Sequence, residues 1–247
     1  MNEQLVFIVR AVATLLLMIT CALLMLVVAC LTAFQLRRFY SEGMATPMGK
    51  VALRIWGIRI RMHQQEPFPT TQAVYISNHT STLDVFVLIA LGLPNARFFL
   101  SGYLRKLLPL GVIGWLIGIF WTAPQEYPER RRAIFEGAAA TLRRSGESVY
   151  LSPEGERVTT GDIGPFNKGA FHLATTLHAP IVPLFIAIPR STDPGLGLHA
   201  RPGIIDVHVG EAILTTTWRL EDLLANTAHV RAMFVQWNST LRGMSPE

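Results

Sequence analysis

Residues 73–91 read AVYISNHTSTLDVFVLIAL, and the fold of the chain can be inferred outward from this stretch. The first five residues are mostly apolar and are typical of a short buried strand. The polar residues 78–82 follow, and their threonines and serine favour the start of a helix over the apolar run 83–91. A buried strand that leads through a polar turn into a helix is the repeating unit of α/β folds.

The same alternation continues along the chain. Strands are predicted at 55–62, 97–100, 148–151, 180–188 and 204–209, and helices at 129–145, 169–177 and 220–241. In the helix 129–145, which Gly146 ends, Ala133, Ala140 and Leu142 are predicted to face inward. The Pro- and Gly-rich residues 189–202 are predicted to form a flexible loop. This pattern predicts an α/β fold with a mixed, largely parallel sheet flanked by helices.

An unusually apolar run precedes this region. Residues 11–36 contain no charged side chain, and a helix over Ala11–Phe34 would be about 36 Å long. That length can cross a bilayer, and it exceeds the apolar core of a signal peptide. We therefore expect an N-terminal membrane-embedded helix, with a hairpin or a segment lying partly in the interface as the alternative. The predicted division is an anchor at 1–40 and an α/β domain at 41–247.

The charges indicate where the domain lies. Only Glu3 and Arg10 precede the apolar run, whereas Arg37, Arg38 and further basic residues follow it. Basic residues stay on the cytoplasmic side, so the sequence predicts the inner (cytoplasmic) membrane, a cytoplasmic domain and an outside N-terminus. The net charge of +5 suits an anionic membrane surface. The arginines are scattered and no nucleic-acid-binding module occurs, so no nucleic-acid partner is expected.

A second apolar stretch, residues 107–121, is too short to span a membrane, and its Pro and Gly residues argue against a rigid helix. It is either an ordinary buried segment or a surface that dips into the bilayer, with Trp115 and Trp121 at the interface. In the second case its basic neighbours could touch lipid headgroups; these are Arg97, Arg105, Lys106 and Arg130 to Arg132.

The polar turn after the first buried strand holds His79 and Asp84, five residues apart. On one ideal helix they would lie about 140° apart, so they can pair only if His79 lies in the turn and Asp84 in the first helical turn. Asp84 could then accept a proton from one imidazole nitrogen and leave the other as a base. A purely structural hydrogen bond is the alternative.

A second polar cluster comprises SPEGER at 152–157 and FNKGAF at 166–171. It follows a predicted strand and precedes a predicted helix, where open α/β sheets place ligands. Gly155 permits close backbone approach, and Arg157 and Lys168 could hold a phosphate. A capped loop with a surface ion pair is the plainer interpretation. The two cysteines and seven dispersed histidines predict neither a disulfide framework nor a metal site, and no cofactor is expected.

Together these motifs are specific. His-x4-Asp at 79–84, Pro-Glu-Gly-x-Arg at 153–157, Lys-Gly-Ala-Phe at 168–171 and Ile-Val-Pro at 181–183 resemble the lysophospholipid (glycerolipid) acyltransferase family. The resemblance covers about residues 70 to 190. The best-known members of this family are the 1-acylglycerol-3-phosphate acyltransferases.

The resemblance implies a membrane-bound O-acyltransferase. It would move a fatty acyl group from acyl-CoA or acyl carrier protein to the free hydroxyl of a lysolipid, giving phosphatidic acid when the acceptor is 1-acylglycerol-3-phosphate. His79 would be the general base, oriented by Asp84, without a covalent acyl-enzyme. Glu154, Gly155 and Arg157 would bind the acceptor headgroup, with Lys168 as a further phosphate ligand. Membrane lipids and the two substrates would be the partners.

Two departures from the family pattern leave the acceptor and the activity open. Glu156 stands where the family usually has Thr, and residues 118–124 lack the Arg that usually ends the second motif. The acceptor could therefore carry another headgroup, such as an amino-acid-derived or zwitterionic one. A hydrolase that uses Ser81 or water is a second hypothesis, and a lipid-binding membrane protein that has lost activity is a third.

Overall fold

A seven-stranded sheet forms the centre of the protein, of which a computed structural model describes residues 2–244 and the side chains through Leu241. The strand order is β1-β7-β6-β2-β5-β3-β4, and every neighbouring pair is parallel except the antiparallel pair β6–β7. The predicted α/β fold with a mixed, largely parallel sheet is thereby confirmed. The strands are β1 (Ile58–His63), β2 (Val74–Ser77), β3 (Ala96–Ser101), β4 (Phe120–Thr122), β5 (Ser148–Leu151), β6 (Ile181–Ala187) and β7 (Gly203–Val209).

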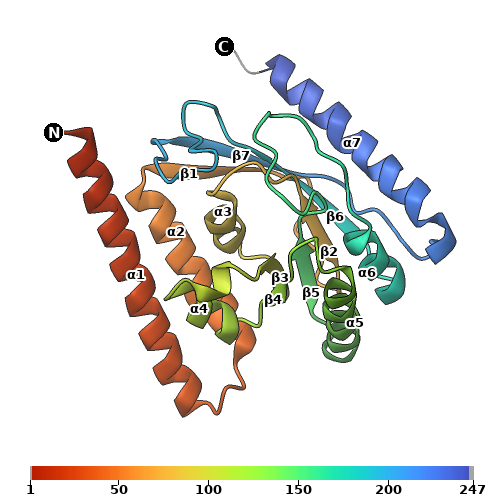
Figure 1. The fold of residues 1–247 in the computed structure, drawn as a ribbon, viewed down its shortest axis with the longest axis horizontal. Coiled ribbons are helices and arrows are strands. Elements are labelled where there is room, and N and C mark those ends of the chain that lie inside the picture. Colours follow the sequence, from red (N-terminus) through yellow and green to blue (C-terminus); the bar gives the residue numbers. More distant parts are fainter. Residues whose placement is uncertain (1, 245–247) are drawn as a thin grey trace.

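Helices cover both faces of the sheet (Figure 1). One face carries α1 (Glu3–Leu31), η1 (Phe39–Ala45), α2 (Thr46–Ile55), α3 (Asp84–Leu91), η2 (Leu104–Lys106) and α4 (Leu110–Leu116). The other carries α5 (Pro128–Ser145), α6 (Gly169–Leu177), η3 (Leu220–Asp222) and α7 (Leu223–Met244). Within β2, Tyr75 packs into the first layer, while Val74 and Ile76 pack into the second. This alternation gives the sheet two cores.

The N-terminal helix α1 packs along the domain. Its inner side is buried against α2 and α4, and the Trp56 indole N–H donates to Thr14 Oγ1 at 3.0 Å. Nearer the N-terminus, Phe7 stacks on His199 with ring centroids 3.8 Å apart. Among the described residues, α1 is the one helix that is long and apolar enough to cross a membrane, judged by length and composition. The predicted division into an anchor at 1–40 and a domain at 41–247 remains a prediction. In the structure α1 packs against α2 and α4.

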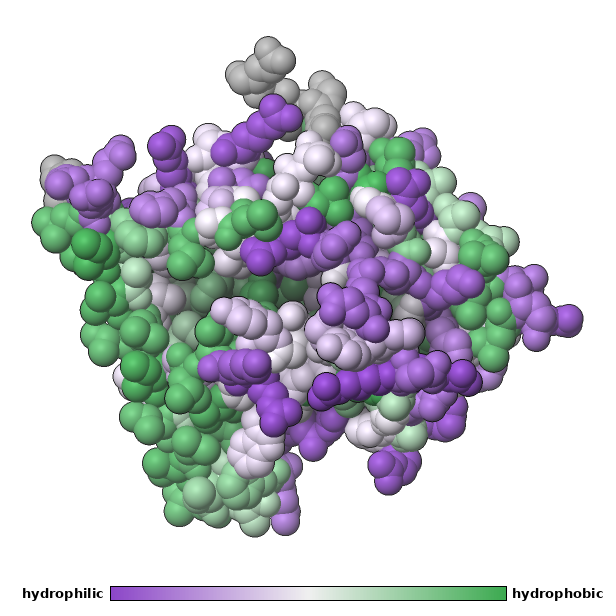
Figure 2. Space-filling model, in the orientation of Figure 1, coloured by the Kyte–Doolittle hydropathy of each residue, from purple (hydrophilic) through white to green (hydrophobic). Residues whose placement is uncertain are grey.

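The outer side of α1 is an exposed apolar surface. It forms the band of hydrophobic side chains along one side of the molecule in Figure 2. This band consists of Leu5, Ile8, Val9, Val12, Leu16, Ile19, Leu23, Leu24, Val27 and Leu31. Soluble monomers rarely expose so large a continuous apolar patch, so a lipid or protein partner is expected to cover it.

The helix α2 was not predicted from the sequence. Gly43, Pro47 and Gly49 interrupt residues 39–55 and concealed the helical pattern. A side chain at Gly49 would lie 3.1 Å from the backbone nitrogen of Ala90, so this glycine allows α2 to pack closely on α3. The predicted strand 55–62 was wrong at its start, because Ile55 ends α2 and Gly57 turns the chain with φ +72°.

The predicted inward face of α5 is partly wrong. Leu142 is buried as expected, but Ala133 and Ala140 are exposed, and Ala138 and Ala139 are buried in their place. The phase of the helix is set by Phe135, whose ring stacks on Phe99 with centroids 4.7 Å apart. Large aromatic contacts outweigh the choice between neighbouring alanines.

The expectation that Arg97 touches lipid headgroups is contradicted. Arg97 is buried, its Nε lies 2.9 Å from Glu147 Oε2, and its guanidinium lies over the Phe120 ring. Arg37, just after α1, also pairs with Glu147, at 3.2 Å. Glu147 therefore joins the segment after α1 to the sheet.

The segment 107–121 contains the short helix α4 and the first two residues of the strand β4, contrary to the expectation of no rigid helix. The helix is only seven residues long, and its Gly111 and Gly114 are buried, where neighbouring atoms leave no room for a larger side chain. Trp115 is exposed, and its ring meets that of Phe34 edge-on, so this segment extends the apolar surface of α1.

Replacing Glu147 with Gln should lower the free energy of unfolding by about 3 kcal/mol, because it leaves Arg97 buried without its anionic partner. The measurement is denaturant-induced unfolding in detergent. Glu136→Gln is the matched control, since Glu136 pairs with the exposed Arg132 and should contribute less than about 1 kcal/mol. Equal losses in the two variants would contradict the structural role given to Arg97.

Candidate active site

The two predicted polar clusters meet at one edge of the sheet. The turn 78–83 follows β2, and the loop 152–168 follows β5. Because β2 and β5 are parallel neighbours, both segments leave the sheet at the same edge, next to each other. Open α/β folds bind their ligands at this carboxyl edge.

The side chains of His79 and Asp84 are hydrogen-bonded to each other, in the arrangement that their sequence positions predicted. His79 lies in the turn before α3, and Asp84 is the first residue of that helix. His79 Nδ1 lies 2.7 Å from Asp84 Oδ2. The expected geometry of the pair is confirmed, and its role in catalysis remains a prediction.

The Asp84 carboxylate also holds the turn itself. Its Oδ2 accepts hydrogen bonds from the backbone N–H groups of Thr80 and Ser81, at 2.9 and 3.0 Å. The side chain is 1% exposed, whereas that of His79 is 27% exposed. A carboxylate at the first turn of a helix also interacts favourably with the helix dipole. Asp84 is therefore fixed, and it directs the other imidazole nitrogen, Nε2, away from itself.

Asn78 fixes the backbone just before His79. Its side-chain Nδ2 donates to the carbonyl of Ile186 at 2.9 Å, and its Oδ1 accepts from the Ile186 N–H at 2.8 Å. On the other side, the hydroxyls of Ser77 and Tyr150 are hydrogen-bonded at 2.8 Å. Burial raises the pKa of the Tyr150 hydroxyl, so it stays neutral. The turn is thus tied to both neighbours of β2 in the sheet.

Glu154 joins the two polar segments. Its Oε2 accepts a hydrogen bond from the His79 backbone N–H at 2.6 Å, and its Oε1 accepts from the Gly164 N–H at 2.8 Å. The residue is 3% exposed. Burial raises the pKa of the Glu154 carboxyl, and the bonds from Gly164 and His79 oppose that rise. Both carboxylate oxygens are therefore engaged by backbone in this structure, while headgroup binding by Glu154 remains a prediction.

Gly155 adopts a conformation that favours glycine. Its φ is +74°, and a Cβ there would lie 2.7 Å from Asn167 Nδ2. Asn167 Nδ2 in turn donates to the carbonyl of Glu154 at 3.0 Å. Gly155 therefore lets Asn167 close the loop over the buried Glu154.

The predicted cationic residues lie at the exposed rim. Arg157 is exposed, and its Nη1 donates to Thr82 Oγ1 at 2.5 Å, within the His79 turn. Lys168 is exposed and directly precedes α6. Glu156, the departure from the family pattern, is also exposed. Arg157 is thus brought next to the His79 turn.

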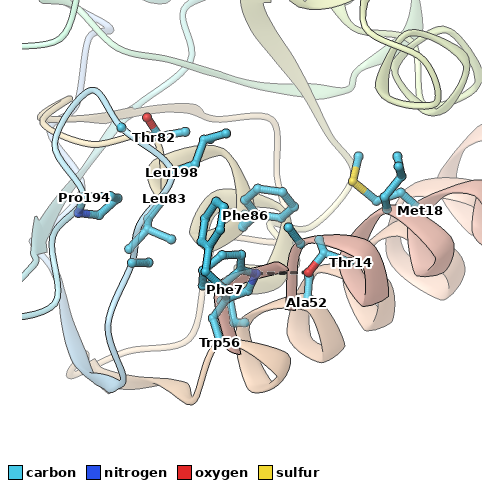
Figure 3. Close-up of a pocket in the computed structure, with 15 residues that line it drawn as sticks. Phe7, Thr14, Met18, Ala52, Trp56, Thr82, Leu83, Phe86, Pro194 and Leu198 are labelled. Carbon is cyan, nitrogen blue, oxygen red and sulfur yellow. Dashed lines mark hydrogen bonds between the residues drawn. The ribbon is translucent and has the colours of Figure 1, made fainter. Parts of the chain in front are cut away.

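An apolar cavity of about 200 Å³ opens beside this turn. Figure 3 shows side chains of α1, α2 and α3 and of the loop 189–202 converging on it. Its labelled lining residues include Phe7, Met18, Trp56, Phe86, Pro194 and Leu198. Thr82 and Leu83 of the turn also line it, so the cavity adjoins the turn that holds His79.

Several site residues were not predicted from the sequence. Asn78 and Tyr150 act through hydrogen bonds to residues far away in the chain, and Gly164 through its backbone N–H alone. The one local signal was the place of Asn78 inside the polar turn. Within the described residues, no three His, Cys, Asp or Glu side chains are grouped to hold a metal ion, and a metal-free site stays a prediction.

The proteins to which this chain is similar are all described as acyltransferases in the matches given below. A family model described as "Acyltransferase" matches residues 59–187, just over half of the chain. The mouse 1-acyl-sn-glycerol-3-phosphate acyltransferase alpha is 33% identical over 142 residues, covering 54% of this chain and 47% of that protein. The human beta enzyme of the same name is 33% identical over 165 residues, covering 65% and 58%. The match thus spans about half the length of these curated relatives.

A solved structure shares the fold. The crystal structure of the 1-acyl-sn-glycerophosphate acyltransferase PlsC from Thermotoga maritima superimposes with a TM-score of 0.72, covering 96% of this chain and all of that one. The two sequences are 18% identical, so this likeness concerns the fold.

The raised pKa of Glu154 predicts a pH dependence of stability. The folded protein binds this proton more tightly than the unfolded chain, whose reference pKa is 4.5. The stability that Glu154 contributes is therefore greatest below that pH and is lost as pH rises through the raised pKa. Glu154→Gln does not titrate. The unfolding free energy of the unmodified protein minus that of the variant should therefore fall as the pH rises above 4.5. A difference that grows with pH would mean that the two backbone donors outweigh burial.

Proposed function

This chain belongs to the acyltransferase family, and on that basis we propose that it is a membrane-bound O-acyltransferase that acylates the free hydroxyl of a lysolipid. The observation that carries the proposal is the fixed hydrogen bond between His79 Nδ1 and Asp84, which leaves Nε2 as a base. The proposed acceptor is 1-acylglycerol-3-phosphate, because the curated relatives carry that name. The donor would be acyl-CoA or acyl carrier protein.

The proposed reaction needs one base and no covalent intermediate. The acceptor hydroxyl gives its proton to His79 Nε2 while its oxygen attacks the thioester carbonyl carbon. The carbon–sulfur bond then breaks, and the leaving sulfur takes the proton back from the imidazolium. Asp84 stabilises the imidazolium that forms in between, because its buried carboxylate is already bonded to Nδ1.

The acceptor headgroup would bind at the rim formed by Arg157, Lys168 and the backbone at Gly155. The proposed role of Arg157 is supported by its hydrogen bond to Thr82, because Thr82 also lines the apolar cavity. A planar guanidinium suits a phosphate. The exposed Glu156 and the missing arginine at 118–124 keep a zwitterionic or amino-acid-derived headgroup as the alternative acceptor.

We propose that the apolar cavity receives a fatty acyl chain. It is lined mostly by apolar side chains, and Thr82 and Leu83 of the His79 turn are among its lining residues. An acyl chain in it would bring its ester or thioester end toward His79. Burial of each methylene there would contribute about 0.8 kcal/mol to binding.

The membrane would supply both lipid substrates from the side of α1. The proposal is supported by the exposed apolar band of α1, its continuation at Trp115 and the cavity between α1 and α2 (Figures 2 and 3). We propose that this side of the protein lies in the cytoplasmic membrane and that the domain faces the cytoplasm, as the flanking arginines predict.

A hydrolase that uses Ser81 has less support. Ser81 is fully buried, its N–H donates to Asp84, and its Oγ accepts from the Leu83 N–H at 3.2 Å. A nucleophile must reach its substrate, and this hydroxyl is occupied in the turn.

Replacing His79 with Ala should lower acyl transfer at least about 100-fold, because the acceptor hydroxyl loses its general base. Asp84→Asn should also lower it strongly, since the imidazole loses its orienting carboxylate. Ser81→Ala is the control and should keep most of the activity. The measurement is transfer from labelled acyl-CoA, or from acyl carrier protein, to a panel of lysolipids in liposomes.

Each outcome of this assay decides between the hypotheses. Transfer to 1-acylglycerol-3-phosphate that needs His79 supports the proposal as stated, and transfer to another lysolipid changes the acceptor. Release of labelled free fatty acid that survives His79→Ala but is lost in Ser81→Ala favours the hydrolase. Absence of both acyl transfer and fatty acid release with either donor favours a lipid-binding protein without activity.

Ala11→Phe should shorten the preferred acyl chain, because Ala11 lines the cavity and a phenyl ring would fill part of it. Loss of room for about two methylenes should reduce kcat/KM for a long-chain donor about 10-fold relative to a short-chain donor. Val12→Phe is the matched control, since Val12 is the next residue of α1 and faces outward. The same shift in both variants would place the acyl chain elsewhere.

A further inference from the structure

The C-terminal helix α7 is hydrogen-bonded to the loop that holds Glu154. Arg231 Nε donates to the carbonyl of Gly164, and its Nη2 donates to the carbonyl of Ile163, each at 2.7 Å. One guanidinium thus holds two successive carbonyls of the loop, which restrains both the position and the orientation of this stretch of backbone.

One peptide unit connects Arg231 to Glu154. The carbonyl of Ile163 and the N–H of Gly164 belong to the same peptide, so Arg231 binds the oxygen of the unit whose N–H donates to Glu154 Oε1. A cation on that oxygen polarises the peptide and strengthens its N–H as a donor. The other oxygen of Glu154 accepts from the backbone N–H of His79.

We propose that Arg231 is a positioning residue for the reaction, acting through the Ile163–Gly164 peptide and Glu154 to hold the backbone of His79. This proposal rests on the proposed function, in which His79 is the general base. It makes the C-terminal helix, which lies outside all the sequence motifs, part of the apparatus that orients the base. In the described hydrogen bonds, Arg231 contacts neither His79 nor Asp84.

A second bond from α7 to the same loop provides a control. Asn238 Nδ2 donates to the carbonyl of Gly161 at 3.1 Å, three residues before Gly164. This bond also ties α7 to the loop, but it does not involve the peptide that Glu154 contacts. The apolar packing of α7 relies on Val230 and Phe234, which are fully buried, so neither polar residue is needed for it.

The experiment compares Arg231→Met with Asn238→Ala in the full-length protein. Arg231→Met should lower kcat on the order of 10-fold to 100-fold with little change in KM, because a displaced base affects the chemical step more than binding. Arg231→Lys should recover part of the loss, since one ammonium can bond one of the two carbonyls. Asn238→Ala should keep kcat near that of the unmodified protein. Equal losses in Arg231→Met and Asn238→Ala would overturn the proposal.

Amide hydrogen exchange tests the connection without any assay of activity. Arg231→Met should speed exchange of the His79 N–H, measured on a peptide that covers residues 78–84, and Asn238→Ala should not. Unchanged exchange in Arg231→Met would overturn the proposal. If the unmodified protein transfers no acyl group, the proposed function has failed, and the exchange result still decides whether Arg231 holds the His79 backbone.

A double-variant cycle tests the route through Glu154. If Arg231 acts through that carboxylate, Arg231→Met should cause little further loss of kcat in a Glu154→Gln background. Losses that multiply would mean that Arg231 acts by another route, and the proposal would be overturned.

Discussion

The buried Asp84 carboxylate is the interaction on which the candidate site depends. A single oxygen accepts bonds from the His79 ring and from two backbone N–H groups of the turn, so the position of the base and the shape of the turn are set together. A buried carboxylate is costly unless it is hydrogen-bonded. The turn between β2 and α3 supplies the three bonds to Oδ2, whereas Oδ1 is buried without a hydrogen-bond partner among the described residues. The bonds to Oδ2 explain why strand, turn and helix follow one another at this short spacing.

A second constraint follows from the proposed function, in which the protein works at a membrane. The sheet presents the site at its carboxyl edge, and an apolar cavity lined by α1, α2, α3 and the loop 189–202 adjoins the turn that holds His79. The two proposed substrates carry acyl chains, and they could reach the proposed base without exposing those chains to water only if the cavity opens toward lipid. The exposed side of α1 and the salt bridges of Glu147 then have related roles: the first would contact lipid, and the second joins the chain after α1 to the sheet.

Sequence patterns predicted the sheet and most of the helices well, because buried strands and amphipathic helices leave a local signal. The pairing of His79 with Asp84 was also predictable, since both lie within one turn. The helix α2 was missed because Gly49, which looks like a helix breaker, is needed for close packing on α3. Arg97 was misassigned because its partner Glu147 lies 50 residues away. The roles of Asn78, Tyr150 and Arg231 were not predicted for the same reason, since each acts through contacts between segments distant in the chain.

The most direct test of the role of His79 as a base is the protonation of its ring, measured by NMR on protein with ¹⁵N-labelled histidine and assigned with a His79→Gln variant. We expect a neutral imidazole with its proton on Nδ1, in a strong hydrogen bond to Asp84, and with Nε2 unprotonated. Asp84→Asn should abolish the signal of that Nδ1 proton. A proton on Nε2 in the unmodified protein, or a ring unaffected by Asp84→Asn, would contradict this role.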